Sequence, residues 1–293
     1  MKRILITGAD SFVGTSFERY ISEYPEYSVD TVDMLEGTWR ECDFSGYDVV
    51  FHVAGIAHSD GGSISKERED LYYSVNTDLT VEVAKKAKRE GVGQFIFMSS
   101  SIVYGKSGAV GKTKHITART EPSPLNCYGD SKLKAEEGIL PLSDKSFKVV
   151  VLRPPMIYGK GGKGNFLTLE KIAKRLPIFP YVKNERSMLY VDNLSEFIRL
   201  MIENCESGVF YPQNAEYTNT SDMVKLIGAA NGKRVRLIKG FGWLIRICAV
   251  FFPFLNKAFG SFTYDKEISK YCKEYCKYTL EDSIKNIYDG KVE

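Results

Sequence analysis

The amino-acid sequence predicts an α/β fold with a doubly wound parallel sheet, followed by a smaller, mostly helical part. Three observations support this fold class. Short apolar strands alternate with helical segments over the first 152 residues, a glycine-rich turn joins the first strand to the first helix, and the alternation becomes irregular after Arg153. Strands that alternate with helices form βαβ units, whose right-handed crossovers place helices on both faces of a parallel sheet.

The elements of the first part follow from local composition, taken in chain order. Strands are expected where β-branched and aromatic residues form short apolar runs, at 2–7, 28–32, 48–53, 94–98 and 148–152. Helices are expected where apolar residues recur at helical spacing and glycine or proline ends the segment, at 12–24, at 66–89 with a break, and at 128–140. We assign residues 1–152 to this first domain.

The remaining residues, 153–293, are predicted to form the smaller part, although some of its segments can return to the first domain. Helices are expected there at 166–175, 192–203 and 221–230. Open α/β sheets bind their ligands at the carboxyl ends of the strands, so a cleft is expected at that edge.

Charge and composition exclude several classes of function. The chain has 293 residues, with 40 Lys and Arg against 37 Asp and Glu, which gives a net charge of +3. A nucleic-acid-binding protein normally shows a dominant basic face, so no nucleic acid is expected as a partner. The 3 His and 6 Cys residues lack zinc-binding spacing, and we expect no metal site. The simplest compartment for such cysteines is the reducing cytoplasm.

We expect no transmembrane segment. The stretch 241–259 is strongly apolar, but Arg246 and Pro253 interrupt it, and its pieces are shorter than the ~18 residues of a membrane-spanning helix. We interpret this stretch as core or as a subunit interface. A peripheral contact with a membrane surface is the alternative.

The turn after the first strand predicts a dinucleotide site of the Rossmann type. Gly8 permits the tight turn, and Gly14 permits close packing of the helix on the strand. Ser11 stands where the usual pattern has its middle glycine. The start of the helix, with Phe12 and Val13, is expected to face a pyrophosphate through its amide groups.

An acid at the end of the second strand predicts which dinucleotide is bound. Asp33 stands where an acid can hold the adenosine ribose. A carboxylate repels the 2′-phosphate of NADP, so Asp33 favours NAD, with NADP as the alternative. A loop or helix-capping role is the other interpretation of Asp33.

Three polar residues predict the chemistry. Tyr128 and Lys132 are four apart on one expected helix and therefore lie on one face. Ser100 lies at the end of an expected core strand, at the sheet edge where ligands bind. A nearby cation such as Lys132 would lower the pKa of the Tyr128 phenol, which is normally about 10. Tyr128 could then exchange a proton with a carbonyl oxygen that Ser100 also binds.

These motifs and others in the first 160 residues resemble the extended short-chain dehydrogenase/reductases of the NAD-dependent epimerase/dehydratase family. The matching segments run in family order, and RSMLYVD at 186–192 extends the match. They are TGxxxxVG at 7–14, HVAG at 52–55, VNT at 75–77, SSS at 99–101 with YG at 104–105, YxxxK at 128–132, and RPP at 153–155 with YG at 158–159.

The resemblance implies roles for further residues. It makes Ser100 the catalytic serine, and it implies that Tyr128 and Lys132 also contact the cofactor. The remaining cofactor contacts that it implies are Asp43 and Phe44 at the adenine, then Val53, Ala54, Gly55 and Pro154, with Asn76 bracing the framework. It places Arg186 and Asn165 at the diphosphate and nucleotide of the substrate. A solvated surface charge at Arg186 and a merely flexible loop at Asn165 are the alternatives.

The resemblance also implies an NAD(P)-dependent enzyme that acts at carbon 4 of a UDP-hexose. Dehydration is disfavoured, because Ser101 and Ile102 stand where dehydratases of the family carry an Asp–Glu pair. We favour a reductase for a UDP-4-keto-6-deoxy-N-acetylhexosamine of capsule or O-antigen biosynthesis. The alternatives are a UDP-glucose or UDP-N-acetylglucosamine 4-epimerase and a non-catalytic NAD(P)-binding sensor. By family habit the protein is expected to be a homodimer.

Overall fold

The computed structural model describes residues 1–35, 37–57, 65–162 and 164–289. The chain packs as two compact units. The first consists of residues 1–105, 121–154 and 195–212, and the second of residues 106–120, 155–194 and 213–293. The chain therefore passes between the units several times. The single boundary predicted at residue 152 lies next to one of these passages, and the segment 195–212 returns to the first unit.

One parallel sheet forms the centre of the first unit, which confirms the predicted fold class. Its strand order is β10–β6–β4–β3–β1–β2, and all neighbouring strands are parallel. The strands are β1 (Lys2–Thr7), β2 (Tyr27–Val32), β3 (Val49–His52), β4 (Gln94–Met98), β6 (Lys148–Leu152) and β10 (Gly208–Phe210).

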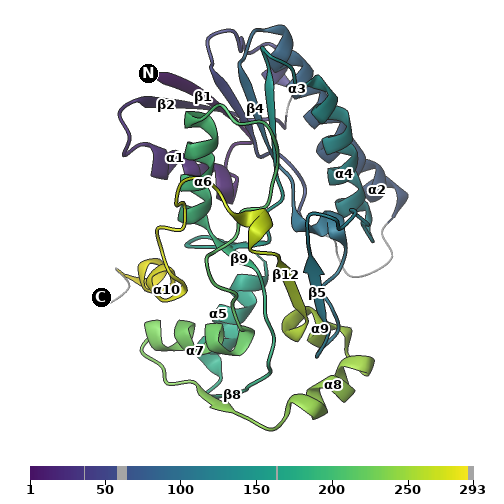
Figure 1. The fold of residues 1–293 in the computed structure, drawn as a ribbon, viewed down its shortest axis with the longest axis vertical. Helices are drawn as coiled ribbons and strands as arrows, with labels where there is room; N and C mark the ends of the chain where they lie inside the picture. Colours follow the sequence, from purple (N-terminus) through teal and green to yellow (C-terminus); the bar gives the residue numbers. More distant parts are fainter. Residues whose placement is uncertain (36, 58–64, 163, 290–293) are drawn as a thin grey trace. The chain divides into compact units, whose positions relative to one another are not determined.

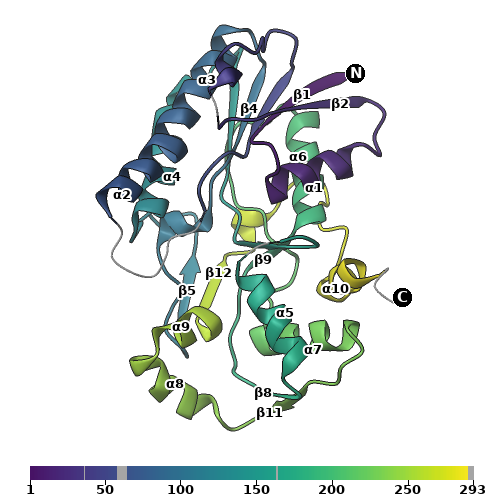
Figure 2. The same ribbon diagram turned by 180° about the vertical axis from the view of Figure 1, so that it is seen from behind.

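Helices cover both faces of this sheet. Figures 1 and 2 show α1 and α6 on one face and α2, α3 and α4 on the other. Their bounds are α1 (Phe12–Ile21), α2 (Lys66–Tyr73), α3 (Leu79–Arg89), α4 (Cys127–Ile139) and α6 (Val191–Glu203). Because both faces are covered, neither face of the inner strands is exposed to solvent, and every residue of β3 and β4 is buried.

The break predicted in the helix at 66–89 is present. A π-helical turn, η2 (Ser74–Asp78), separates α2 from α3, and its centre is the buried Asn76. Single π turns are rare and often occur at functional sites. Short 3₁₀ turns lie at η1 (Thr38–Arg40), η3 (Ser101–Tyr104) and η4 (Leu140–Leu142).

The second unit combines helices with three small sheets. Figure 2 shows α5 beside α7. The helices are α5 (Asn165–Arg175), α7 (Thr220–Ala230), α8 (Gly242–Phe251), α9 (Pro253–Phe259) and α10 (Leu280–Tyr288), with the 3₁₀ turn η5 (Glu267–Ser269). The two-stranded parallel sheets are β5 (Thr113–Ile116) with β12 (Ser261–Tyr264), β7 (Met156–Tyr158) with β9 (Met188–Tyr190), and β8 (Ile178–Pro180) with β11 (Arg236–Ile238).

Candidate active site

The turn after β1 has the geometry that a dinucleotide needs. Gly8 has a φ of +118°, and a Cβ there would lie 2.7 Å from the backbone nitrogen of Ala54. Only glycine fits this position. A Cβ on Gly14 would lie 2.5 Å from the Ser11 Oγ and 3.2 Å from a methyl carbon of Ile6, so α1 packs directly on its strand. The two glycines therefore permit the tight turn and the close helix–strand packing of a dinucleotide-binding motif.

Ser11 acts as the N-cap of α1. Its Oγ accepts a hydrogen bond from the Gly14 amide at 3.1 Å, in extended backbone conformation with φ −72°. Serine thus replaces the middle glycine of the usual pattern without strain. The amides of Phe12 and Val13 lie in the first turn, where helix amides and the helix dipole attract an anion. The residues present fit a pyrophosphate.

Asp33 follows β2 at an exposed position. Its Oδ1 accepts a hydrogen bond from the Leu35 amide at 3.0 Å, so it caps its own turn as the alternative interpretation proposed. A hollow of about 320 Å³ lies beside this turn and is lined by Met34, Gly37, Trp39 and Leu79, among others. Its one arginine, Arg40, is held by two hydrogen bonds of 2.6 Å to the carboxylate of Glu82.

The two residues expected at the adenine differ in their surroundings. Asp43 is exposed, and its Oδ1 accepts from the Ser45 amide at 2.8 Å, which lowers the pKa of the carboxyl group. Phe44 is completely buried in the core of the first unit. Its amide donates to Glu90, and the Lys86 ammonium lies 4.8 Å from its ring centre. The contact of Phe44 with an adenine stays a prediction, and the buried ring has no exposed surface to supply it.

Ser100 and Tyr128 are brought together at the carboxyl end of the sheet. Ser100 follows β4 and caps η3, with its Oγ 3.3 Å from the Ile102 amide. Tyr128 is the second residue of α4, whose N-cap Asn126 accepts from the Gly129 amide at 2.8 Å. The hydroxyl of Ser100 lies close enough to the phenol of Tyr128 to oppose the rise of its pKa. These two groups can therefore act on the same substrate oxygen.

Burial shifts the pKa values of Tyr128 and Lys132, which both lie on α4. It raises the pKa of Tyr128, against the opposing effect of Ser100, and the nearby phenol of Tyr72 raises it further. Burial lowers the pKa of Lys132 to about 8, although Glu136 opposes the shift. The expected lowering of the Tyr128 pKa by Lys132 is therefore not observed. Tyr128 is held protonated and is suited to donate a proton.

Lys132 and Asn76 lie against the loop after β3. The Lys132 Nζ donates to the carbonyl of Met98 at 2.9 Å. A Cβ on Gly55 would lie 2.9 Å from the Asn76 Oδ1 and 3.1 Å from the Lys132 Nζ, so this close approach requires glycine. The Asn76 amide accepts from the nitrogen of Ile56 and donates to its carbonyl. Asn76 therefore braces the loop, in agreement with the role implied for it.

Three other residues implied at the cofactor support the same edge of the sheet. The amides of Val53 and Ala54 donate to the carbonyl of Thr7 at 3.0 and 2.9 Å, which fixes them against the glycine turn. Pro154 is buried, and its carbonyl accepts from the Ser101 amide at 2.9 Å. Pro154 thus positions the turn that carries Ser100.

A buried ion pair that the sequence reasoning missed holds these elements together. Arg153, directly after β6, donates to the Glu136 carboxylate from Nε at 3.0 Å and from Nη2 at 2.5 Å. The Ser99 hydroxyl also donates to Glu136, and the Arg153 Nη1 donates to the Tyr104 hydroxyl at 2.7 Å. The signal in the sequence was an acid four residues after Lys132, on the inward face of a helix.

Arg186 and Asn165 belong to the second unit. The Arg186 Nη1 donates to the carbonyls of Lys257 and Ala258 at 2.7 and 3.3 Å, in the last turn of α9. Burial lowers the pKa of this guanidinium. Arg186 is therefore half-buried and partly engaged by backbone carbonyls. Asn165 begins α5, and its side chain lies outside the described residues.

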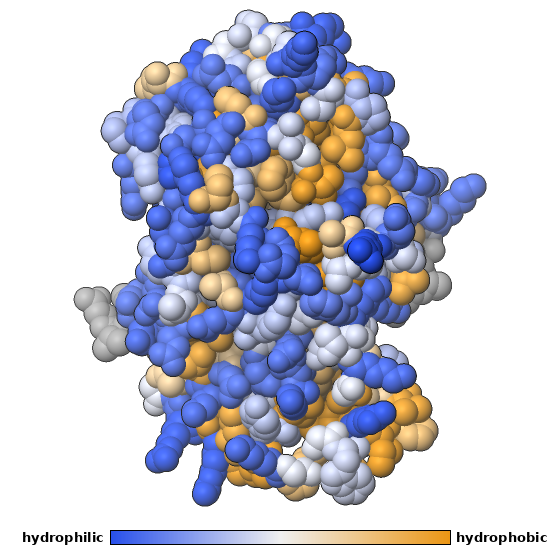
Figure 3. Space-filling view, in the orientation of Figure 1, coloured by the Kyte–Doolittle hydropathy of each residue, from blue (hydrophilic) through white to orange (hydrophobic). Residues whose placement is uncertain are grey.

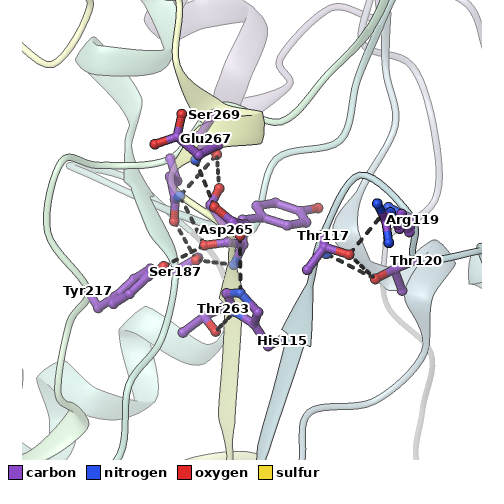
Figure 4. Close-up of polar contacts among 12 residues, drawn as sticks. His115, Thr117, Arg119, Thr120, Ser187, Tyr217, Thr263, Asp265, Glu267 and Ser269 are labelled. Atoms are coloured by element: carbon purple, nitrogen blue, oxygen red, sulfur yellow. Dashed lines mark hydrogen bonds and ion pairs between the residues drawn. The ribbon is translucent and has the colours of Figure 1, made fainter.

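Side chains of other segments hydrogen-bond to the backbone of β12, the strand that pairs with Arg186 (Figure 4). Ser187 accepts from the Tyr264 amide at 2.8 Å, and the Tyr217 hydroxyl donates to the Tyr264 carbonyl at 2.7 Å. The His115 Nε2 lies 3.5 Å from the Asp265 Oδ2. A hollow of about 300 Å³ lies nearby in this unit, lined by Gln213, Lys266, Ser269 and Cys276, among others. Within the part of the chain that the structure describes, no three His, Cys, Asp or Glu residues are grouped to hold a metal.

The chain matches known proteins in sequence. A UDP-glucose 4-epimerase of Vibrio cholerae is 32% identical over 258 residues, which cover 79% of this chain and 76% of that protein. An N-acetyl-alpha-D-glucosaminyl-diphospho-ditrans,octacis-undecaprenol 4-epimerase of Escherichia coli O157:H7 is 30% identical, over 70% of this chain and 64% of that protein.

The fold is also shared with solved structures. A UDP-glucuronic acid 4-epimerase from Bacillus cereus, solved in complex with NAD, superposes with a TM-score of 0.72 at 19% identity and covers 98% of this chain and 97% of that one. Residues 4–212 match the NAD dependent epimerase/dehydratase family, and this range contains the glycine turn, Ser100, Tyr128 and Lys132. The chain belongs to the NAD dependent epimerase/dehydratase family and is an NAD(P)-dependent enzyme.

Proposed function

We propose that the protein is an oxidoreductase that acts at carbon 4 of a UDP-hexose. Its net reaction is reduction of a UDP-4-keto-6-deoxy-N-acetylhexosamine for the synthesis of capsule or O-antigen. The observation that carries this proposal is the half-buried Tyr128, whose pKa is raised by burial and which lies next to Ser100 and on the same face of α4 as Lys132. Reduction of a carbonyl requires such a proton donor.

The proposed roles follow from the contacts of each residue. A bound dinucleotide would supply the hydride that reduces the carbonyl carbon. Ser100 would hydrogen-bond to the keto oxygen and orient it, and Tyr128 would donate its phenolic proton to that oxygen. Lys132, on the same face of α4, would contact the dinucleotide. A positioned acid of this kind accelerates a reaction by about 10²–10⁴-fold.

We propose NAD as the preferred dinucleotide. Asp33 at the end of β2 can bind the ribose hydroxyls through its carboxylate. The arginine beside it, Arg40, lines the hollow but is already paired with the Glu82 carboxylate. This pairing opposes the binding of a 2′-phosphate by Arg40. In the second unit, Arg186 is proposed to bind the substrate diphosphate, and Asn165 at the start of α5 its nucleotide half.

A second candidate is a 4-epimerase, which oxidises carbon 4 and reduces it again on the other face. The names of the two relatives from Vibrio cholerae and Escherichia coli favour this reaction. Dehydration is not proposed, because Ser101 and Ile102 offer no acid beside the serine.

Two assays distinguish the candidates. The purified protein is mixed with a UDP-2-acetamido-2,6-dideoxy-4-keto-hexose and either NADH or NADPH, and the loss of reduced cofactor is followed by absorbance. The second assay follows interconversion of UDP-glucose with UDP-galactose, and of the corresponding N-acetylhexosamines. Oxidation of NADH supports the reductase. Interconversion without oxidation of either cofactor would show that the epimerase is correct.

We also propose that the protein is a homodimer in the cytoplasm. The six cysteines are all free thiols, which agrees with a reducing compartment. Sedimentation equilibrium of the purified protein measures the oligomeric state directly.

A further inference from the structure

An exposed apolar face covers α8 and α9 in the second unit. Figure 3 shows apolar atoms gathered over α8. Trp243 is 67% exposed, Val250 77%, Phe251 74% and Phe254 66%. We define the α8–α9 face as the exposed large apolar side chains of this segment, Phe241, Trp243, Leu244, Ile247, Val250, Phe251, Phe252 and Phe254.

The arrangement of this segment separates an inner side from an outer side. Ala249 and Phe259 are buried, and the Phe259 ring packs on the Phe179 ring at 5.8 Å between centres. The exposed residues of α8 recur at helical spacing from Trp243 to Phe251, so they share the outer side. Monomeric proteins rarely expose a continuous apolar surface of this kind unless it binds something.

The charge around the face indicates its partner. Residues 223–264 contain seven Lys and Arg residues and no Asp or Glu. All seven are exposed: Lys225, Lys233, Arg234, Arg236, Lys239, Arg246 and Lys257. Tryptophan and phenylalanine on a short helix with flanking cations are typical of segments that lie in the interface of an anionic bilayer. No helix of the described residues is long and apolar enough to cross a membrane.

We propose that the α8–α9 face binds the anionic surface of a lipid bilayer, with its aromatic side chains inserted among the acyl chains and its cations at the headgroups. A second copy of the chain fits the face less well, since it would bring two sets of seven like charges together. This inference is independent of the reaction proposed for the first unit.

The natural tryptophans provide a direct test with the full-length protein. Trp39 is 1% exposed and Trp243 is 67% exposed, so a change of solvent at the surface is reported by Trp243. Vesicles of phosphatidylcholine alone, or with phosphatidylglycerol added, are titrated into the protein. We expect a blue shift of the fluorescence and cosedimentation with the anionic vesicles, both weakened by salt. The Trp39→Phe variant should keep the shift, and Trp243→Phe should lose it while cosedimentation remains.

Matched variants separate the apolar and basic contributions. Phe251→Ser should weaken binding about tenfold, and Arg246→Gln about fivefold. Leu71→Ser and Lys145→Gln remove an exposed apolar and an exposed basic side chain elsewhere and should leave binding unchanged. Thermal unfolding by circular dichroism shows that each variant is folded.

Two results would overturn the proposal. One is failure of the wild-type protein to bind anionic vesicles, or equal binding to both kinds of vesicle. The other is self-association in sedimentation experiments that Phe251→Ser abolishes, without vesicle binding, which would make the face a contact between copies of the chain.

Discussion

Tyr128 and Lys132 respond to burial in opposite directions. Burial raises the pKa of the phenol and lowers that of the ammonium, because in each case it disfavours the charged form. Before a ligand binds, both side chains are therefore biased toward neutrality. In the proposed reaction, transfer of the Tyr128 proton to a substrate would leave a phenolate on the same face of α4 as Lys132.

Replacement of Tyr128 tests the proton donor. We expect Tyr128→Phe to lower kcat by about 10²–10⁴-fold, because the phenolic proton is lost, while NAD(H) still binds. Steady-state kinetics and a cofactor titration measure the two effects. Tyr73→Phe is the matched control, since the Tyr73 hydroxyl donates to Asp130 at 2.7 Å and has no place in the proposed chemistry. Wild-type turnover in Tyr128→Phe would exclude it as the acid.

Asp33 is predicted to set the preference between dinucleotides. Asp33→Ser removes a charged acceptor for the ribose and a repulsive charge for the 2′-phosphate. We expect NADH to bind about 10–100-fold more weakly, and NADPH to bind more tightly than it does to the wild-type protein. The ratio of the two dissociation constants is the measurement, and an unchanged ratio would show that Asp33 only caps its turn.

Local geometry could be predicted where it follows from spacing alone. Tyr128 and Lys132 lie on one face of α4 because they are four residues apart, whereas the family resemblance selected Ser100 among three serines. The burial of Phe44 and the engagement of Arg186 by carbonyls of α9 depend on segments far along the chain, about which local spacing carries no information.

At the scale of elements, the ends of the strands decide where the site lies. The glycine turn follows β1, the braced loop at Gly55 follows β3, the serine turn follows β4, and Arg153 follows β6. All lie at the carboxyl edge of one parallel sheet, as in other open α/β sheets that bind ligands. The π turn at Asn76 belongs to this support, since its side chain holds the loop at Ile56.

The Glu136–Arg153 pair should be necessary for stability. Glu136→Gln leaves the buried Arg153 guanidinium without its counter-charge, and we expect the free energy of unfolding to fall by about 3–5 kcal/mol. Urea unfolding measures this change. Glu137→Gln, at the exposed neighbouring position, should change the same quantity by no more than about 0.5 kcal/mol. Equal effects of the two substitutions would contradict the structural role.

The five-residue strands of the central sheet could be predicted from the sequence, whereas the shorter strands of the second unit could not. The strands at 94–98 and 148–152 have the predicted bounds, because apolar runs of this length are unambiguous between polar flanks. The three two-stranded sheets of the second unit have strands of three or four residues, which are too short to show an alternation. The stretch 241–259 was expected as core or interface, yet most of its large side chains are exposed.

At the scale of the whole molecule, we expect the buried His52 to make the free energy of unfolding depend on pH. His52 is buried, and its Nε2 lies 3.0 Å from the Thr80 Oγ1, which itself donates to the carbonyl of Asn76. Nε2 must therefore carry the hydrogen, and Nδ1 accepts from the Thr7 hydroxyl at 2.7 Å. A second proton on the ring would remove that acceptor. Burial lowers the pKa of His52 to about 3, assisted by the charge of Lys132.

This histidine should contribute to unfolding in acid. Below pH 6.5, the ordinary pKa of histidine, His52 binds a proton in the unfolded chain, but in the folded chain it does so only when the pH falls to about 3. The free energy of unfolding therefore decreases as the pH falls across that window. The folding equilibrium constant should fall by about tenfold per pH unit from this group alone. His52→Gln should show a shallower dependence in urea unfolding at a series of pH values. Parallel curves for the two proteins would refute the assignment.

The interleaving of the two units also affects how the chain is made. The first unit needs β10 (Gly208–Phe210), which pairs with β6 (Lys148–Leu152) as the outer strand of the sheet. At about 5–20 residues per second, a ribosome needs several seconds to pass from β6 to β10. During that time the nascent sheet carries an apolar edge with unpaired backbone groups. The second unit's residues 155–194 emerge in this interval, so a chaperone that shields β6 during translation would favour correct closure of the sheet.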